Sequence, residues 1–101
     1  MKLWIDDVRP APEGYYWLRT VIDAKFLIET VLGDSFEYLI ELIDIDHDAG
    51  ECASDGGDYI KLLDWLEETG RSFPIRIHSM NPVGVENMRR IIQRNGWTEI
   101  K

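Results

Sequence analysis

The feature that most constrains the fold is an apolar, β-branched segment that ends abruptly in charged residues. The segment Leu42–Ile45 leads directly into Asp46, His47 and Asp48, and Gly50 follows two residues later. Such a run, which we expect to start near residue 38, predicts a buried central strand whose last side chains reach the sheet edge. Ligands of open α/β sheets bind just outside the carboxyl ends of the strands, so we expect a functional site here.

Two other strand-like segments end in the same way. Lys2–Ile5 and Ile75–Ile77 are both rich in apolar residues, and the residues that follow them are Asp6, Asp7, His78 and Ser79. Because parallel strands meet one edge with their carboxyl ends, the sequence predicts that carboxylates, two imidazoles and a hydroxyl converge there.

Turn and cap residues place the remaining elements. Residues 15–19 and 97–100 predict two further strands, and residues 74–79 predict the strand that ends at Ser79. Three helices are expected after the caps Thr20, Asp58 and Asn81, with ends at Gly33, Gly70 and Gly96. We expect residues 50–57, rich in small and acidic residues, to form a flexible loop. The order β-β-α-β-α-β-α-β predicts an α/β fold with a largely parallel sheet.

Size and charge limit the classes of function. The length of 101 residues predicts a single domain over residues 1–101. No apolar segment approaches the roughly 18 residues that a membrane span needs. A net charge of −8 argues against binding to duplex DNA, although residues 71–101 carry six basic and two acidic residues. The single cysteine, Cys52, excludes an internal disulfide, and we expect a cytoplasmic protein without a membrane partner.

With these residues placed, the chain resembles receiver domains of two-component signalling. More closely, it resembles the cyclic-phosphate processing receiver domains. The resemblance is carried by residues 4–14, 18–20, 45–48, 57–59, 65–68 and 78–84 together with Gly50, and above all by Asp46-His47-Asp48 and His78-Ser79-x-Asn81-Pro82. It implies a receiver-like (flavodoxin-like) α/β fold with a five-stranded, mainly parallel sheet in the order 2-1-3-4-5, lacking the first and last receiver helices.

The resemblance also implies a metal site. Asp6 and Asp7 match the acidic pair that binds magnesium in ordinary receivers, and Asp46 matches their phosphate acceptor. Converging carboxylates repel one another, and a hard divalent cation such as Mg²⁺ or Mn²⁺ relieves that repulsion. The alternative is that Asp7 merely pairs with Arg9 and caps a turn.

His47 and His78 are the only histidines of the chain. Two imidazoles on either side of a phosphodiester can act as acid and base, with Asp48 orienting His47. The alternative is that either histidine is structural, with its ring satisfied by a carboxylate.

The resemblance therefore implies a metal-assisted phosphoesterase that processes a cyclic phosphate on a nucleotide or an RNA end. Arg9, Ser79 and Asn81 are expected to orient the phosphate, with Arg19 as a further phosphate-binding candidate, although Asn81 also fits a helix cap. The rival hypothesis is a non-catalytic receiver-type signalling module, with or without phosphorylation on Asp46. The missing helices leave one sheet face uncovered, and Trp4, Trp17 and Arg76 are the candidates for that face. A contiguous aromatic patch there predicts a homodimer, whereas scattered charges such as Lys2 and Glu41 could keep the face solvated.

Overall fold

The computed structural model describes residues 1–32 and 39–101, in which four parallel strands form the sheet. They are β1 (Lys2–Ile5), β2 (Tyr15–Leu18), β3 (Leu42–Ile45) and β4 (Ile75–Ile77). Their spatial order is β2-β1-β3-β4, and every neighbouring pair is parallel. The receiver-like α/β fold expected from the sequence is confirmed, as is the order of these four strands.

The fifth strand that was predicted at residues 97–100 is reduced to an isolated bridge between Ile75 and Glu99. The Ile75 N–H donates to the Thr98 carbonyl at 2.9 Å, and the Ile100 N–H donates to the Ile75 carbonyl at 2.8 Å. A strand needs consecutive bridges, and only the first residue of the short strand β4 makes one here. The segment nevertheless lies on the predicted side, beside β4.

Three helices follow the predicted positions: α1 (Val21–Leu32), α2 (Ile60–Glu68) and α3 (Pro82–Asn95). The predicted caps at both ends of α3 are present. The Asn81 side chain accepts from the backbone of the first turn, and Gly96 adopts a left-handed conformation after the last. The predicted end of the first helix at Gly33 and the expected start of the third strand near Tyr38 lie outside the described residues.

The prediction that Asp58 caps the second helix is wrong. The Asp58 carboxylate accepts the N–H of Ala49 at 3.0 Å instead, and Tyr59 precedes α2 without a side-chain cap. Ala49 is fully buried, so its N–H would otherwise lack an acceptor. The predicted loop of residues 50–57 contains a short 3₁₀ helix, η2 (Gly50–Ser54).

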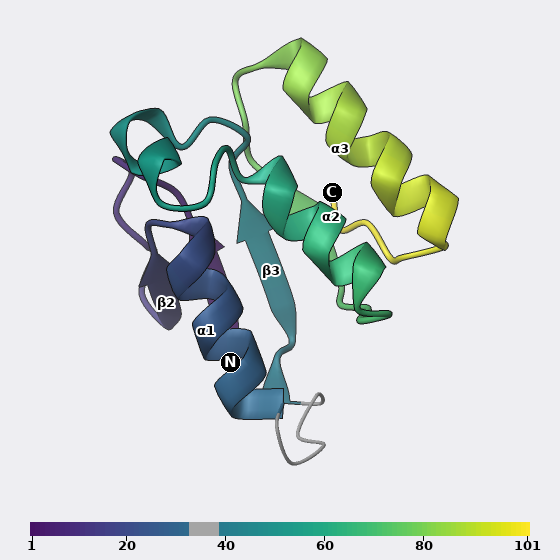
Figure 1. Ribbon diagram of the computed structural model, residues 1–101, viewed down its shortest axis with the longest axis horizontal. Helices are drawn as coiled ribbons and strands as arrows, with labels where there is room; N and C mark the ends of the chain where they lie inside the picture. Colours follow the sequence, from purple (N-terminus) through teal and green to yellow (C-terminus); the bar gives the residue numbers. More distant parts are fainter. Residues whose placement is uncertain (33–38) are drawn as a thin grey trace.

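All three helices lie on one face of the sheet (Figure 1). Five strand residues on that face are fully buried and form the core with the helices: Leu3, Ile5, Ile43, Ile45 and Ile75. Register places Trp4, Trp17 and Arg76 on the opposite face, where the described residues contribute no helix. Trp17 is 40% exposed and Arg76 is exposed, so the homodimer expected through this face stays a prediction.

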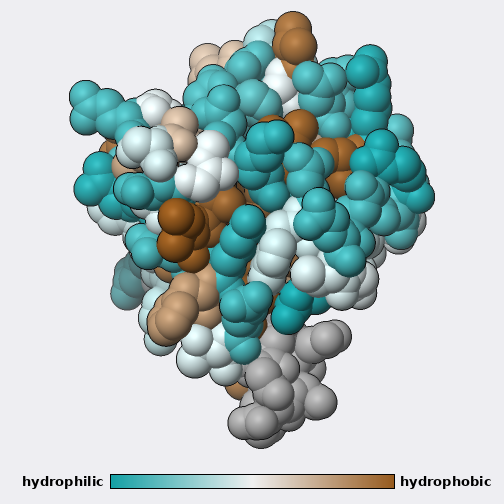
Figure 2. Space-filling model, viewed as in Figure 1, coloured by the Kyte–Doolittle hydropathy of each residue, from teal (hydrophilic) through white to brown (hydrophobic). Residues whose placement is uncertain are grey.

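The helical side of the molecule is mostly hydrophilic at its surface (Figure 2). Apolar surface is visible on α1, which carries the exposed side chains of Ile22 and Phe26. None of the helices in the described part of the chain is long and apolar enough to cross a membrane.

Candidate functional site

The backbone ladder of the sheet continues past the ends of the strands and positions the residues of the site. The Asp46 N–H donates to the Ile5 carbonyl at 2.9 Å, and the His78 N–H donates to the Ile45 carbonyl at 2.9 Å. Both residues are therefore held by the neighbouring strand, although neither belongs to a strand itself. This arrangement brings the acidic and imidazole side chains to one edge of the sheet.

Three carboxylates meet at this edge. One oxygen each of Asp6, Asp7 and Asp46 lies within 4.8 Å of the other two. Asp6 is 0% exposed and Asp46 is 8% exposed, whereas Asp7 is half-buried. The structure thus brings together the three residues that were predicted to hold a metal ion.

Asp6 is the most extensively hydrogen-bonded member of this cluster. Its Oδ1 atom accepts the N–H groups of Val8 and Arg9, both at 3.0 Å, and its Oδ2 atom lies 3.0 Å from Nε2 of His78. Burial alone would raise the pKa of Asp6. The two backbone hydrogen bonds and the contact with His78 outweigh burial and hold the pKa of Asp6 below its ordinary value of 3.8.

Asp7 lies against the backbone of Gly50, which has a φ of +54°. A Cβ atom at position 50 would overlap the Asp7 carboxylate, so this approach requires glycine. Beyond these two residues, an open cleft of about 430 Å³ is lined by Asp7, Val8, Arg19, Gly50, Glu51 and Cys52. Asp7 is therefore the member of the cluster that lines this cleft.

Arg9 spans the edge above the cluster. Its guanidinium group lies 3.4 Å from Oδ2 of Asp6 and 3.9 Å from Oδ2 of Asp46, and it donates to the His78 carbonyl at 3.2 Å. The side chain is about half exposed. Arg9 therefore lies where it can contact both the carboxylates and an approaching anion.

His78 is bonded through both of its ring nitrogens. Nδ1 lies 2.6 Å from Asp44 Oδ1, and Nε2 lies 3.0 Å from Asp6 Oδ2. Both ring nitrogens are therefore engaged by carboxylates. The ring also stacks on Trp4, with a centroid distance of 3.8 Å and an interplanar angle of 5°. In this arrangement neither nitrogen is available to a substrate, contrary to the acid–base role expected for His78.

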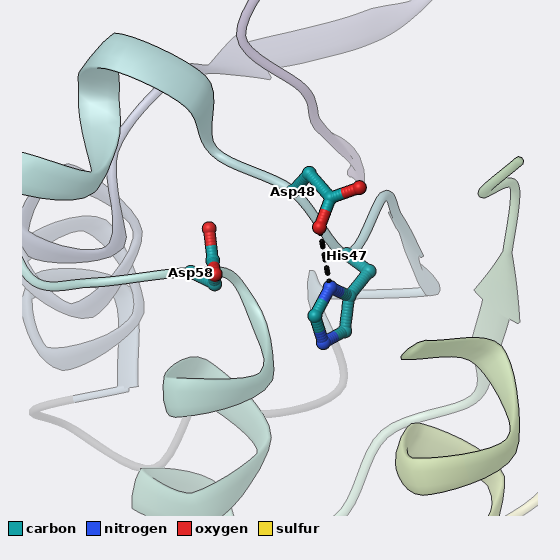
Figure 3. A group of neighbouring side chains, drawn as sticks. All are labelled: His47, Asp48 and Asp58. Atoms are coloured by element: carbon teal, nitrogen blue, oxygen red, sulfur yellow. Dashed lines mark hydrogen bonds and ion pairs between the residues drawn. The ribbon is translucent and has the colours of Figure 1, made fainter. Parts of the chain in front are cut away.

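His47 has one bonded nitrogen. Nδ1 lies 2.7 Å from Asp48 Oδ1, and the other ring nitrogen points away from Asp48 (Figure 3). Among the residues that the structure describes, none is hydrogen-bonded to Nε2. Asp58 lies close enough for the three side chains to offer ligand atoms within 4.8 Å of one another.

Asp48 is hydrogen-bonded to His47, and it is itself held by Asn81. The hydrogen bond with His47 lowers the pKa of Asp48 below its ordinary value, partly opposed by burial and assisted by the Asn81 amide. The Asn81 Nδ2 group donates to Asp48 Oδ1 at 3.2 Å, while its Oδ1 atom accepts the Gly84 N–H at 3.0 Å. The Asn81 side chain therefore both caps α3 and holds Asp48 in place.

Ser79 lies near this cap, where its Oγ atom accepts the Asn81 N–H at 3.2 Å. Its hydroxyl proton remains available to a further acceptor. On the described part of the chain, no side chain of the acidic cluster is hydrogen-bonded to Ser79.

A comparison with known protein families identifies the family of this chain. Residues 1–94 match the family model described as cyclic-phosphate processing receiver domain. The chain belongs to this family. No curated protein and no solved structure matches the chain. The family name ties this receiver domain to cyclic-phosphate processing, and it assigns no role to individual residues.

The sequence analysis missed three residues that shape the site. Asp44 and Trp4 hold His78, and Gly84 provides space for the His47 ring, since a Cβ atom there would overlap the imidazole. A signal for Asp44 was present, because an aspartate inside the apolar segment Leu42–Ile45 needs a buried partner. Neither the stacking of Trp4 nor the contact of Gly84 with His47 leaves a comparable signal in sequence.

Proposed function

We propose that this receiver domain is a metal-assisted phosphoesterase that opens a cyclic phosphate on a nucleotide or on an RNA end. The observation that carries the proposal is the carboxylate cluster of Asp6, Asp7 and Asp46. His47 directly follows Asp46 in the chain, and its Nε2 atom is available. Membership in the cyclic-phosphate processing family supports the substrate class.

The cluster fits a hard divalent cation such as Mg²⁺ or Mn²⁺, which prefers carboxylate oxygens and retains several waters. Because both Asp6 oxygens already accept hydrogen bonds, Asp7 and Asp46 are the residues that would hold the ion directly. Asp6 adds negative charge beside them. The ion would supply Lewis acidity, polarising a phosphoryl oxygen of the substrate.

His47 performs the proton transfers in this proposal. Its Nε2 atom takes a proton from water as the water oxygen bonds to phosphorus. The same nitrogen returns the proton to the ring oxygen as its bond to phosphorus breaks, which leaves a phosphate monoester and a hydroxyl group. The contact of Asp48 with Nδ1 keeps the ring in the tautomer that this role requires.

The proposal revises the two-histidine prediction. His78 donates to Asp44 and Asp6, so its task is to hold the buried carboxylates in place. Arg9 contacts the phosphate from above the cluster, and the Ser79 hydroxyl donates to a phosphoryl oxygen. Asn81 acts through Asp48.

The test is a panel of 2′,3′-cyclic, 3′,5′-cyclic and 1″,2″-cyclic phosphates incubated with the protein and Mg²⁺ or Mn²⁺, followed by phosphorus NMR. We expect monoester formation from at least one of them. His47→Ala should lower turnover by on the order of 10²–10⁴, the usual effect of general acid–base catalysis. Asp46→Asn should also lower turnover, because it removes a carboxylate that would hold the ion. Asp64→Asn on α2 is its matched control and should keep full turnover. No turnover of any compound by the metal-loaded protein would contradict the proposal.

A second candidate function rests on the bonded state of His78. With only one available imidazole nitrogen, the edge also suits a signalling receiver in which an Asp46 oxygen attacks a phosphoryl donor and the donor's leaving group departs. Incubation with acetyl phosphate and Mg²⁺, followed by intact mass measurement, distinguishes the two. A stable mass gain that Asp46→Asn abolishes supports signalling, whereas turnover of a cyclic phosphate supports the enzyme.

A further inference from the structure

Apart from Asp7, the residues that line the cleft beside the carboxylate cluster have no part in the proposed phosphate chemistry. It lies between the residues that follow β1, the residue that follows β2, and the start of η2. Its volume of about 430 Å³ falls within the range of small-molecule sites. Asp7 belongs to both the cluster and the cleft, so a phosphate held at the cluster places its organic part beside the cleft.

Arg19 is the basic residue of the cleft, and it is held firmly. Its Nε atom donates to the Asp7 carbonyl at 3.0 Å, and its guanidinium carbon lies 5.4 Å from the centroid of the Trp17 ring. Within the described residues, its two terminal nitrogens make no hydrogen bond. Arg19 therefore presents donors from a fixed position.

The acids of the cleft decide which ligand suits those donors. Glu51 is exposed and lines the cleft together with Asp7. If a cation neutralises Asp7, the remaining charges of Arg19 and Glu51 balance each other. A second phosphate would meet the Glu51 carboxylate beside Arg19, which disfavours a dianionic ligand.

Hydroxyl groups suit this pair better than any charged group, because each hydroxyl both donates and accepts. The remaining lining residues are Val8, Cys52 and Gly50, so no aromatic ring among them offers a stacking surface to a nucleobase. A hydroxyl-bearing, uncharged ring of moderate size matches this lining.

We infer that the cleft binds the sugar that carries the cyclic phosphate, with Arg19 donating to its oxygens and Glu51 accepting from a hydroxyl. This inference rests on the proposed phosphoesterase function and assigns recognition of the substrate's sugar, rather than of a nucleobase, to this cleft. Arg19 and Glu51 are then the residues that distinguish a sugar from a simpler diol.

Two probes with the same fused ring test the inference. The 2,3-cyclic phosphate of the anhydro sugar 1,4-anhydro-D-ribitol carries a free hydroxymethyl group, and the cyclic phosphate of cis-tetrahydrofuran-3,4-diol differs from it only in lacking that group. We expect kcat/KM to favour the sugar probe by about tenfold to a hundredfold, the effect of one hydrogen bond to a charged group. Glu51→Gln and Arg19→Gln should bring that ratio toward one. The matched exposed controls Glu68→Gln and Arg90→Gln should retain it.

The outcomes separate the two proposals. If both probes are opened at equal kcat/KM, the cleft assignment is overturned and the phosphoesterase stands. If neither is opened, the phosphoesterase is decided by the full panel of cyclic phosphates, and tryptophan fluorescence decides the cleft assignment through binding alone, because Arg19 lies over Trp17. Tighter binding of the sugar probe that Glu51→Gln abolishes still supports the cleft, whereas equal binding of both probes overturns it.

Discussion

His47 and His78 follow the neighbouring strands β3 and β4, but their surroundings differ. His78 lies between two carboxylates of the sheet and against an indole, with both nitrogens bonded. His47 lies at the start of α3 with one bonded nitrogen and a half-exposed carboxylate partner. The same residue type is thus fully bonded on one side of the edge, whereas on the other side one of its nitrogens remains available.

The difference follows from the parity of the strands. His78 continues the face of β4 that carries Arg76, and Asp44 and Trp4 share that face in the neighbouring strands. His47 lies one residue beyond Asp46 and turns toward the helices, where Gly84 leaves room for its ring. Variants on each side of the edge can therefore test which histidine stabilises the fold.

The largest effect is expected from Asp44→Ala on the His78 side. The variant removes one partner of a buried pair and leaves Nδ1 of His78 without its hydrogen-bond partner, which typically costs about 3–5 kcal/mol. We expect the free energy of unfolding, measured by urea titration with tryptophan fluorescence, to fall by that amount.

Leu42→Ala is a useful comparison, because it shortens a half-buried side chain of the same strand without breaking an ion pair. A loss from Asp44→Ala no larger than that from Leu42→Ala would show that the contact with His78 contributes little. In that case the contrast between the two histidines would disappear.

The next effect is expected from Gly84→Ala on the His47 side. Alanine is favoured over glycine inside a helix by about 1 kcal/mol, so propensity alone predicts stabilisation. The new Cβ would overlap the His47 ring, however, and such overpacking typically costs about 1–3 kcal/mol. We expect net destabilisation in urea titrations and displacement of His47 from Asp48, visible as a changed imidazole signal by NMR.

A double variant isolates the steric cause. In a His47→Ala background the overlap is absent, and Gly84→Ala should then be neutral or stabilising. Destabilisation of the same size in both backgrounds would show that the contact between Gly84 and His47 is not the reason.

The sequence predicted the elements of the fold well, because periodicity and caps are local signals. Thr20 accepts the Asp23 N–H at 2.9 Å as its capping pattern indicates. Asp58 was misassigned because a cap and an acceptor for a distant N–H require the same residue type. The fifth strand was overestimated because sequence does not show how many residues of β4 remain available for pairing.

The site was predicted as a set of residues that share one edge, but not as a network of contacts. Strand ends are sufficient to place Asp6, Asp7 and Asp46 together. Which imidazole nitrogen is bonded depends on Asp44, a residue 34 positions before His78, and on the stacking of Trp4. Such long-range contacts become defined only when the strand register is known.

Acid should weaken the fold by protonating Asp6, which contacts His78. The folded protein holds the pKa of Asp6 below its ordinary value of 3.8, so ionised Asp6 favours the folded state. That contribution is present above about pH 4 and is lost as the pH falls through the lowered pKa.

Asp6→Asn should reduce the decline of unfolding free energy in acid, measured by urea titrations at stepwise lower pH. The pKa of Glu67 is lowered too, by Arg94, so Glu67→Gln is the surface comparison. An identical acid decline in Asp6→Asn and the parent protein would contradict this cause.

The smallest effect on stability is expected from Asp48→Asn. Asp48 is more than half exposed, and exposed ion pairs typically contribute about 0–1 kcal/mol, so the unfolding free energy should change by no more than that. Asparagine can still accept from His47 through its side-chain oxygen, but it lacks the charge that stabilises a protonated ring. Turnover of a cyclic phosphate should therefore fall while the urea midpoint hardly moves.

Asp44→Ala should show the opposite balance, with the larger loss in stability. If Asp48→Asn lowered stability as much as Asp44→Ala, His47 would be structural like His78, and the edge would lack an imidazole for proton transfer.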